Sequence, residues 1–191
     1  MTRRRWRRRT TSLVVLASLT PLLAGCGDSD SSSTASPPSG TPSPTASGSP
    51  PRVEPASGRR ISLAALTVHT VEGYDYDNSL AKEIVFSSSR DLGQDLTFSD
   101  ISVYPGTSNA RAARLTIKNS FWHRRPRTAS PVTIDDEQWY HLTGPIGEGK
   151  HLEDYGTVHD SRLVRISFEL TGPASKRAAI VDSVLATVDL R

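Results

Sequence analysis

Apolar and polar side chains alternate along much of the C-terminal part of this chain. From Val164 to Leu170 every second side chain is apolar, which indicates a strand with one buried face. Within the segment 96–104 the alternation changes parity after Phe98, which predicts a β-bulge or a bend near Asp100. An apolar stretch predicts a further strand at 61–68, and other strands are predicted at 82–87, 132–134, 138–143, 150–158 and 187–190.

Two segments repeat their apolar residues at helical spacing instead. Ser108 is the predicted N-cap of the first helix, which Pro126 limits at its far end. The second helix is expected to begin at Pro173 or Ser175. The side chains predicted to face the core are Ala110, Ala113, Ile117 and Phe121 in the first helix, and Ile180, Val181, Val184 and Leu185 in the second. Strand runs interrupted by two helices indicate an α+β fold, in which helices flank an antiparallel β-sheet.

Turn-forming residues divide the strands into an antiparallel meander. A glycine-rich break is predicted at 144–147 and a hairpin turn at 159–161. Earlier in the chain, turns are expected at 72–73 and at 77–78. The connections are short, so neighbouring strands in the sequence are expected to pair.

Residues 27–58 show neither the alternation of a strand nor the apolar spacing of a helix. They are almost entirely Ser, Thr, Pro, Gly and Ala, and Val53 is their only large apolar side chain. Such a segment cannot bury enough surface to offset the entropy of ordering, so we expect a flexible linker. The chain is therefore divided into a signal segment at 1–25, a cysteine and linker at 26–58, and a folded domain at 59–191.

The first 26 residues have the three parts of a bacterial export signal. Six arginines within the first nine residues precede an apolar stretch at 12–23, which is too short for a membrane-spanning helix. Leu23-Ala24-Gly25-Cys26 then resembles the lipobox of bacterial lipoproteins. The resemblance implies cleavage between Gly25 and Cys26, a diacylglycerol on the Cys26 thiol, and a protein anchored on the extracytoplasmic face of the cell membrane. The route, general secretory or twin-arginine, stays open.

The net charge of the chain changes sign when the predicted signal segment is left out. The whole chain carries +3 and has a pI of about 9.2. When the six N-terminal arginines are removed from the 23 basic side chains, 17 remain against 20 acidic ones, a net charge of −3. This balance gives no broad positive field for phosphates, which argues against a nucleic-acid partner. Cys26 is the sole cysteine, so it has no partner for an intrachain disulfide. Frequent Arg, Ala and Thr indicate a GC-rich genome, such as that of an actinobacterium.

Three segments resemble the PsbP-like family, whose fold is an α/β/α sandwich. They are VTIDDEQWYHLTG at 132–144, HLEDYGTVHDSRLVRISFEL at 151–170 and AAIVDSVLATVDL at 178–190. One departure is the turn at Asp136-Glu137, where the family more often has a glycine. The resemblance implies the fold, which is well populated by non-enzymatic binding and assembly proteins, and it implies no reaction.

Histidines and carboxylates between residues 138 and 161 are the candidates for catalysis or metal binding. On the predicted strand 150–158, alternate residues share one face. The histidines lie eight to ten residues apart, unlike the close pairs that are typical of zinc sites. A solvated polar face is therefore the favoured interpretation, and no catalytic residue, metal ligand or cofactor is predicted. The candidates for the alternative, a metal or enzyme site, are His141, His151 and His159, with the carboxylates Glu153, Asp154 and Asp160.

The run His159-Asp160-Ser161 contains the residue types of a nucleophilic triad. Members of such triads meet across a fold, whereas consecutive residues in a turn point in different directions. The chain also has no Gly-x-Ser-x-Gly motif. We therefore interpret these three residues as a polar hairpin turn.

Aromatic and basic residues gather between the first helix and the next strand. One interpretation is a contact surface for an anionic lipid, a wall polymer or an acidic protein. The other, which the sequence favours, is that Phe121 ends the helix in the core while arginines cover its C-terminus. The residues of the candidate contact surface are Trp122, His123, Arg124, Arg125 and Arg127.

The sequence thus predicts a lipid-anchored, extracytoplasmic binding or assembly module without a cofactor or a nucleic-acid partner. The alternative is an envelope hydrolase or metal-dependent enzyme with a site around His141, His151 and His159. A deep polar cleft around the first two histidines would favour the enzyme, and a shallow surface with exposed aromatic side chains would favour the binding module.

Overall fold

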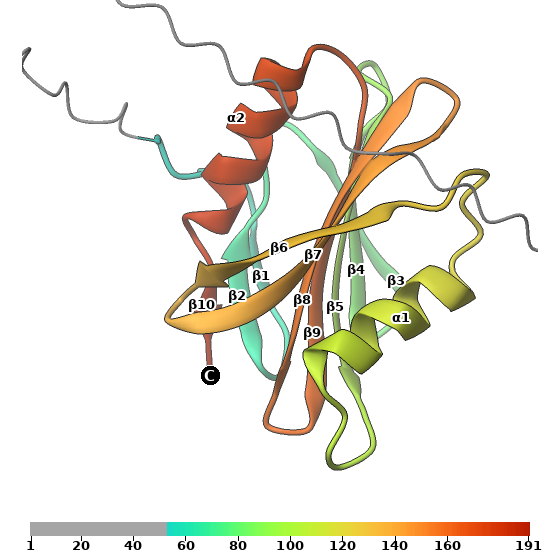
Figure 1. Cartoon of the computed structure of the whole chain (residues 1–191). Coiled ribbons are helices and arrows are strands. Elements are labelled where there is room, and N and C mark those ends of the chain that lie inside the picture. Colours follow the sequence, from blue (N-terminus) through green and yellow to red (C-terminus); the bar gives the residue numbers. More distant parts are fainter. Residues whose placement is uncertain (1–52) are drawn as a thin grey trace, which may run out of the picture. The chain divides into compact units, whose positions relative to one another are not determined.

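Ten strands and two helices make up residues 53–191, the part of the chain that the computed structural model describes (Figure 1). Seven strands form one antiparallel sheet in the order β3-β4-β5-β9-β8-β7-β6, and three form a small sheet in the order β1-β2-β10. The α+β class with an antiparallel sheet and flanking helices is therefore confirmed. The elements are β1 (Arg60–Ser62), β2 (Leu66–His69), β3 (Asp75–Ala81), β4 (Ile84–Ser89), β5 (Gln94–Ser102), α1 (Asn109–Asn119), β6 (Arg127–Ile134), β7 (Glu137–Gly147), β8 (Lys150–His159), β9 (Arg162–Leu170), α2 (Ala174–Leu185) and β10 (Asp189–Leu190).

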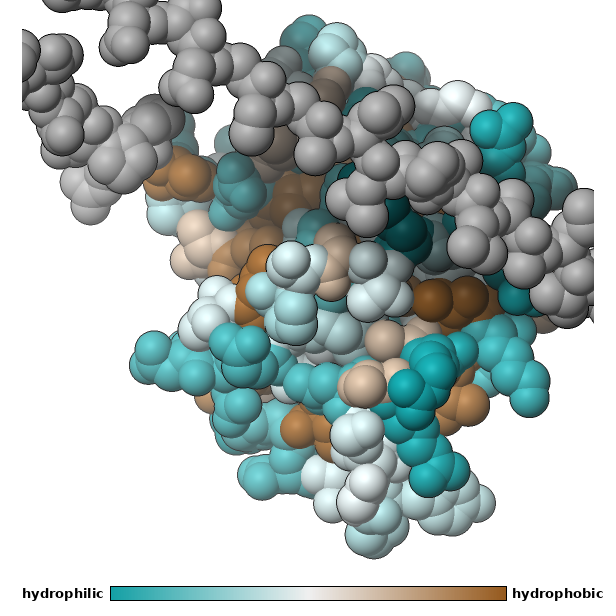
Figure 2. All heavy atoms as spheres, in the orientation of Figure 1, coloured by the Kyte–Doolittle hydropathy of each residue, from teal (hydrophilic) through white to brown (hydrophobic). Residues whose placement is uncertain are grey.

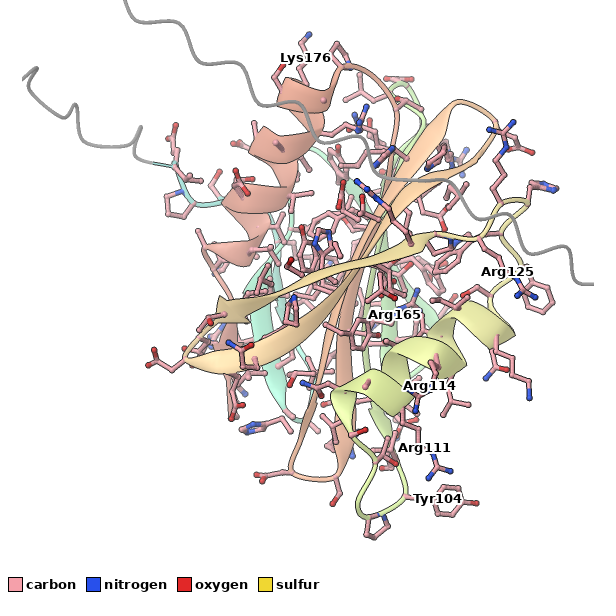
Figure 3. The ribbon with its side chains drawn as sticks, in the orientation of Figure 1. Tyr104, Arg111, Arg114, Arg125, Arg165 and Lys176 are labelled. Carbon is pink, nitrogen blue, oxygen red and sulfur yellow. The ribbon has the colours of Figure 1, made fainter. Side chains whose placement is uncertain are left out.

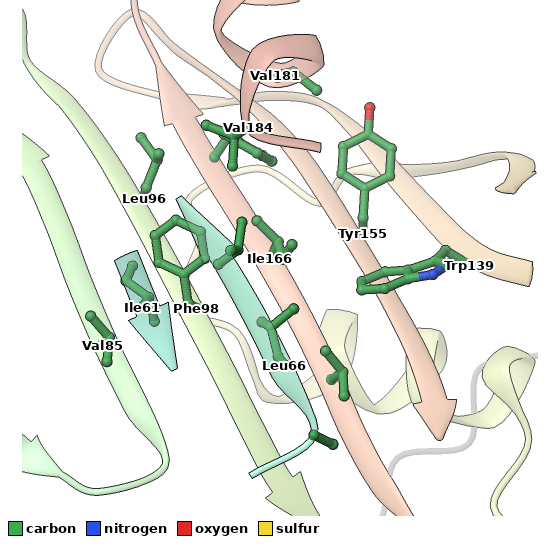
Figure 4. Close-up of a cluster of buried hydrophobic side chains, with 14 of the residues drawn as sticks. Ile61, Leu66, Val85, Leu96, Phe98, Trp139, Tyr155, Ile166, Val181 and Val184 are labelled. Atoms are coloured by element: carbon green, nitrogen blue, oxygen red, sulfur yellow. The ribbon is translucent and has the colours of Figure 1, made fainter. Parts of the chain in front are cut away.

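The seven-stranded sheet has an inner face, which carries Phe168, and an outer face, which carries Arg165. The small sheet and α2 pack on the inner face, and their side chains form the main hydrophobic cluster (Figure 4). On the outer face, α1 packs over β7 and β8. The largest fully buried side chains of the main cluster are Trp139, Phe98, Phe168, Ile61, Leu66, Leu96, Ile166 and Leu170.

The alternation predicted for β9 is correct. Val164, Ile166, Phe168 and Leu170 are each 0% exposed. The three apolar residues before Leu170 lie in one cluster with Val181 and Val184 of α2, as the helical spacing of α2 predicts. The outer side of this strand is also partly covered, and Ser167 is buried there.

The strand predicted at 61–68 is instead a hairpin of β1 and β2. The Leu63 N–H donates to the Leu66 carbonyl over 2.8 Å and closes a tight turn. The Ala65 N–H donates over 2.5 Å to the Asp100 carboxylate of β5. A single apolar run therefore contains two strands, because a buried side chain 35 residues away satisfies its turn.

The β-bulge predicted near Asp100 does not form. The pairing of β5 with β9 runs without a shift from Asp95 to Ser102. Asp100 keeps the inner-face position and is fully buried, with its carboxylate bound to Arg162 and to the Ala65 N–H. The parity change arises because a paired carboxylate occupies a core position, and Ile101 faces outward at 40% exposure.

Two predicted interruptions are also wrong. The segment 144–147 lies within β7, with a register shift between Pro145 and Gly147. The segment 77–78 lies within β3, where the register shifts after Asp77. Glycine and polar turn residues here mark bulges in continuous strands.

Tight two-residue turns join β6 to β7, β7 to β8 and β8 to β9. Both turn residues have positive φ in each case: 49° and 59° at Asp135-Asp136, 52° and 73° at Glu148-Gly149, and 46° and 61° at Asp160-Ser161. Left-handed residues at both turn positions match the twist of the flanking strands. The hairpin predicted at 159–161 is confirmed, and the turn before β7 lies one residue earlier than the PsbP-like resemblance implied.

The first helix begins where the sequence predicts but ends sooner. The Ser108 hydroxyl caps it by accepting a hydrogen bond from the Arg111 N–H over 3.3 Å. Ser120 is extended, with φ −80° and ψ 148°, so Phe121 leaves the helical stripe. Phe121 is 99% exposed and Ala110 is also exposed, and the helix instead buries Ala112 and Ala113. The interpretation that Phe121 lies in the core is therefore wrong.

Contacts of the domain begin a few residues before Arg59. The Ala56 N–H donates to the Ser183 carbonyl of α2 over 2.8 Å, and the Gly58 N–H donates to the Thr70 carbonyl over 2.9 Å. Ala56 also packs against the main hydrophobic cluster. Neither helix in the described part of the chain is long and apolar enough to cross a membrane.

Candidate functional site

The segment from Ser120 to Arg127 connects α1 to β6 and is fixed at one point by Trp122. The indole N–H of Trp122 donates over 3.0 Å to the Glu169 carboxylate of β9. The Arg165 guanidinium lies 5.8 Å from the centroid of the same ring, and the ring packs against the smaller hydrophobic cluster under α1. Trp122 is thus the anchor of the segment on the outer face of the sheet.

The other predicted contact residues are exposed around this anchor. His123 lies 3.8 Å from the Glu148 carboxylate and is largely in solvent. Arg124, Arg125 and Arg127 are exposed, and none of them is paired with another residue in the range 53–191. The structure therefore brings all five predicted residues into one surface segment, and it adds Phe121, which sequence reasoning had assigned to the core.

A groove of about 530 Å³ lies beside this segment on the outer face of the sheet. One wall comes from β4 and β5, which α1 does not cover, and the other comes from residues 119–123. The groove is open to solvent and combines apolar rings with hydroxyl groups. Its main lining residues are Ile84, Phe86, Thr97, Ile101, Phe121 and Trp122.

Arg165 forms part of the groove and is held by a buried carboxylate. The Arg165 Nε donates to Asp154 Oδ2 over 2.7 Å, and Nη2 lies 2.5 Å from the same oxygen. Burial raises the pKa of Asp154, and the Arg165 charge opposes this effect. Asp154 is fully buried, and its Oδ1 has no hydrogen-bond partner among the described residues. The ion pair fixes the Arg165 head beneath Trp122, because both partners are tied to adjacent central strands.

Two of the three candidate histidines meet on the inner face through Glu153. His141 Nε2 lies 2.6 Å from Glu153 Oε2, and His151 Nε2 lies 3.2 Å from Glu153 Oε1. The Thr143 hydroxyl donates to Glu153 Oε1 over 2.9 Å. The His141 ring stacks on Tyr155 with the centroids 4.4 Å apart. This cluster borders a pocket of about 320 Å³ beneath α2.

Burial alone would raise the pKa of Glu153. Hydrogen bonds from His141 and Thr143, together with the charges of His141 and His151, hold it below its usual value. The carboxylate therefore stays ionised and occupied by its neighbours. Burial raises the pKa of the neighbouring Tyr155 phenol, so this hydroxyl stays protonated at neutral pH.

His159 lies apart from the other two candidate histidines. Its Nδ1 is 3.5 Å from Glu137 and its Nε2 is 3.9 Å from Asp160. The turn residues Asp160 and Ser161 are both left-handed, and the three consecutive residues do not form a triad. Within residues 53–191 there is no group of three or more His, Cys, Asp or Glu residues placed to hold a metal ion.

Gly25 and Cys26, the predicted cleavage and lipidation site, lie outside the described residues. So do the signal segment at 1–25 and most of the predicted linker. The lipid anchor on Cys26 therefore stays a prediction from the lipobox resemblance.

Sequence reasoning missed the groove and the ion pair at its base. The alternation in β9 predicts one buried face and so leaves the polar positions between its apolar residues to solvent, but Ser167 is buried and Arg165 is half-buried. A signal was present, because Asp154 stands between Leu152 and Val158 among the outer-face positions of β8. Arg165 lies diagonally across from Asp154 on the neighbouring strand, and an acid and a base in such positions on one face of a sheet indicate an ion pair.

Comparison with known proteins identifies the fold. No family model and no curated protein matches the chain. Cyanobacterial PsbP (CyanoP) from Synechocystis sp. PCC 6803 is similar over 75% of this chain and 98% of its own length, with 14% sequence identity and a TM-score of 0.52. A crystal structure from Bacteroides thetaiotaomicron is similar over 70% of this chain, with 16% identity and a TM-score of 0.48, and the similarity covers 48% of that protein. The domain therefore has a PsbP-like fold, as the three sequence segments implied.

Proposed function

We propose that this protein is a lipid-anchored binding or assembly module on the extracytoplasmic face of the cell membrane, with no catalytic activity of its own. Its anchor is the lipidated Cys26. Its contact surface is the segment from Phe121 to Arg127 together with the neighbouring groove. The partners that fit this surface are an envelope protein, a wall polymer or an anionic lipid.

The observation that carries the proposal is the position of Phe121. The ring is 99% exposed although the next residue is fixed to the sheet by the Trp122–Glu169 hydrogen bond. A large aromatic side chain in water loses the free energy that burial would supply, roughly 1.5–3 kcal/mol. Contact with a partner would recover this free energy, and the groove beside the ring offers further apolar area.

The enzyme alternative has weaker support from the geometry. His141, His151 and Thr143 all hydrogen-bond to or contact the Glu153 carboxylate. A carboxylate that is occupied in this way holds a sheet surface together, and it is not available to a substrate proton. The fold is compatible with a binding role, since PsbP-like folds are well populated by non-catalytic binding proteins.

The test is site-specific photo-crosslinking in living cells. A photoreactive phenylalanine analogue replaces Phe121 in the full-length protein, and the matched control carries the same analogue at Leu92, an exposed apolar residue in the β4–β5 turn. We expect one reproducible crosslinked species from position 121 and none from position 92. The crosslink should disappear when Arg124→Glu and Arg125→Glu are added, and it should persist in His151→Ala.

Crosslinking with equal yield at both positions would contradict the assigned surface. Loss of the crosslink in His151→Ala, with the fold intact by circular dichroism, would move the functional site to the histidine cluster. The charge-reversal variant needs the same folding control, because a collapsed domain would also lose its partner.

A further inference from the structure

Basic residues are concentrated in one continuous part of this domain. The segment 109–127 contains six basic side chains and no acidic one. The other described residues contain ten basic and 18 acidic side chains, a net charge of −8. The domain is therefore strongly polarised although its total charge is close to zero.

Helical geometry places half of these cations on one stripe of α1. Arg111, Arg114 and Lys118 are spaced by three and four residues, so they share one face of the helix. Leu115 belongs to the same stripe and is 42% exposed. Figure 3 shows Arg111 and Arg114 projecting from α1, with Arg125 beyond its C-terminal end. In Figure 2, hydrophilic and hydrophobic side chains lie next to each other over this helix.

We call this surface the basic face. No side chain among its cations forms an ion pair or a hydrogen bond with another residue in the described range 53–191. All of them are exposed, and so are the two apolar side chains between them. The basic face consists of Arg111, Arg114, Leu115, Lys118, Phe121, Arg124, Arg125 and Arg127.

We propose that the basic face docks on the surface of an anionic lipid bilayer, with the Phe121 ring in the headgroup layer. Exposed cations are attracted to anionic headgroups, and each Lys or Arg near the surface strengthens binding by about fivefold. The aromatic ring and Leu115 enter the boundary between headgroups and acyl chains. The inference deepens the proposed function and rests on it for the nearby bilayer, which the Cys26 anchor supplies.

The remainder of the domain determines the orientation. Its net charge of −8 is repelled by anionic headgroups, so only the basic face can approach the bilayer closely. Attachment through the linker would keep the domain at a high effective concentration near the surface, so a weak face is sufficient.

A bilayer fits this face better than a linear wall polymer does. The cations lie on the convex side of a helix about 16 Å long and continue over an exposed loop, which is a broad surface and not a channel. A hydrated polymer chain would also leave Phe121 and Leu115 in water, whereas the interfacial layer of a membrane accepts aromatic rings.

Lysine footprinting tests the docking. The mature protein, extracted from cell membranes, is reconstituted in vesicles of phosphatidylcholine alone or of phosphatidylcholine with phosphatidylglycerol, and its amines are labelled briefly. Lys118 is the only lysine on the basic face, and Lys176 at the start of α2 is the internal reference, since it is also exposed and lies far from α1 in Figure 3. We expect slower labelling of Lys118 relative to Lys176 on the anionic vesicles only, and recovery at high salt.

Matched variants check that the protection comes from charge. Arg111→Gln with Arg114→Gln should lower the ratio of docked to undocked protein about 30-fold. Arg60→Gln with Arg90→Gln removes the same charge from exposed positions on β1 and after β4, and should leave Lys118 protected. Phe121→Ala should weaken the protection without changing its dependence on salt.

If Lys118 is not protected on anionic vesicles, the inference is wrong. Labelling in the presence of soluble polyphosphate is the second arm. Protection by polyphosphate but not by anionic vesicles would show that the basic face binds polymers and not a bilayer. Equal protection on neutral vesicles would overturn the charge argument as well. If Cys26 carries no lipid, the proposed function fails separately, and the same footprint with added vesicles still tests the face.

Discussion

Two phenylalanines give a matched test of how this domain is stabilised. Phe168 is 0% exposed and lies opposite Leu96 of β5 in the sheet. The Tyr155 ring approaches it edge-on with the centroids 6.2 Å apart, and α2 covers the same cluster. Phe121 is 99% exposed. Replacing either residue by alanine removes the same atoms from opposite environments.

The expected costs follow from burial. Phe168→Ala loses the transfer free energy of a fully buried ring and leaves a cavity in a sheet that cannot collapse freely, so it should destabilise the domain by about 3–5 kcal/mol. Phe121→Ala should change the stability by no more than about 0.5 kcal/mol. For a domain of this size the first change lowers Tm by roughly 10–15 °C.

Urea unfolding followed by tryptophan fluorescence measures both values, since Trp139 is fully buried in the same cluster. A cost below about 1 kcal/mol for Phe168→Ala would refute the packing of the inner face. A cost above about 1.5 kcal/mol for Phe121→Ala would refute the exposed position of that ring, and with it the contact surface built around it.

Three further changes test other parts of the structure. A Cβ at Gly156 would lie 2.5 Å from the Tyr140 hydroxyl oxygen, so Gly156→Ala should cost about 1–3 kcal/mol in thermal unfolding; an unchanged Tm would show that the ring is free to move. Asp160→Asn with Ser161→Gly suits two left-handed turn positions and should stabilise the domain by about 1 kcal/mol; a loss of stability would exclude this turn. The Glu153 pKa is held below its ordinary value of 4.5, so the native state binds fewer protons than the unfolded state in that range and stability should fall as the pH drops below about 4.5. Glu153→Gln should flatten that acid limb, and an unchanged pH profile would count against the hydrogen-bonded carboxylate.

The sequence predicts most of the strands because their faces are unequally buried. The alternation in β9 marks its inner face directly, since every apolar position from Val164 onward is fully buried. The same reasoning fails at Asp100, where it predicts a bulge or a bend. The Asp100 carboxylate occupies a core position and pairs there with Arg162, 62 residues away. A local pattern contains no record of that partner.

The residues of the candidate contact surface could be found from the sequence composition, but the exposure of Phe121 could not. Phe121 continues the helical spacing of Ala113 and Ile117, so periodicity places it in the core. The helix ends at Asn119 and the backbone is extended at Ser120, so the Phe121 ring leaves the helical stripe and lies in solvent. The groove combines this segment with β4 and β5, and that pairing depends on the order of strands in the sheet.

Intact mass spectrometry of the membrane-extracted protein shows whether Cys26 carries the proposed lipid anchor. We expect a mature chain that begins at Cys26 and carries the added mass of a diacylglyceryl group on its thiol. Cys26→Ala should abolish both the added mass and the retention in membranes. A mature chain with an unmodified Cys26, or with its N-terminus at another residue, would contradict a lipid-anchored binding module.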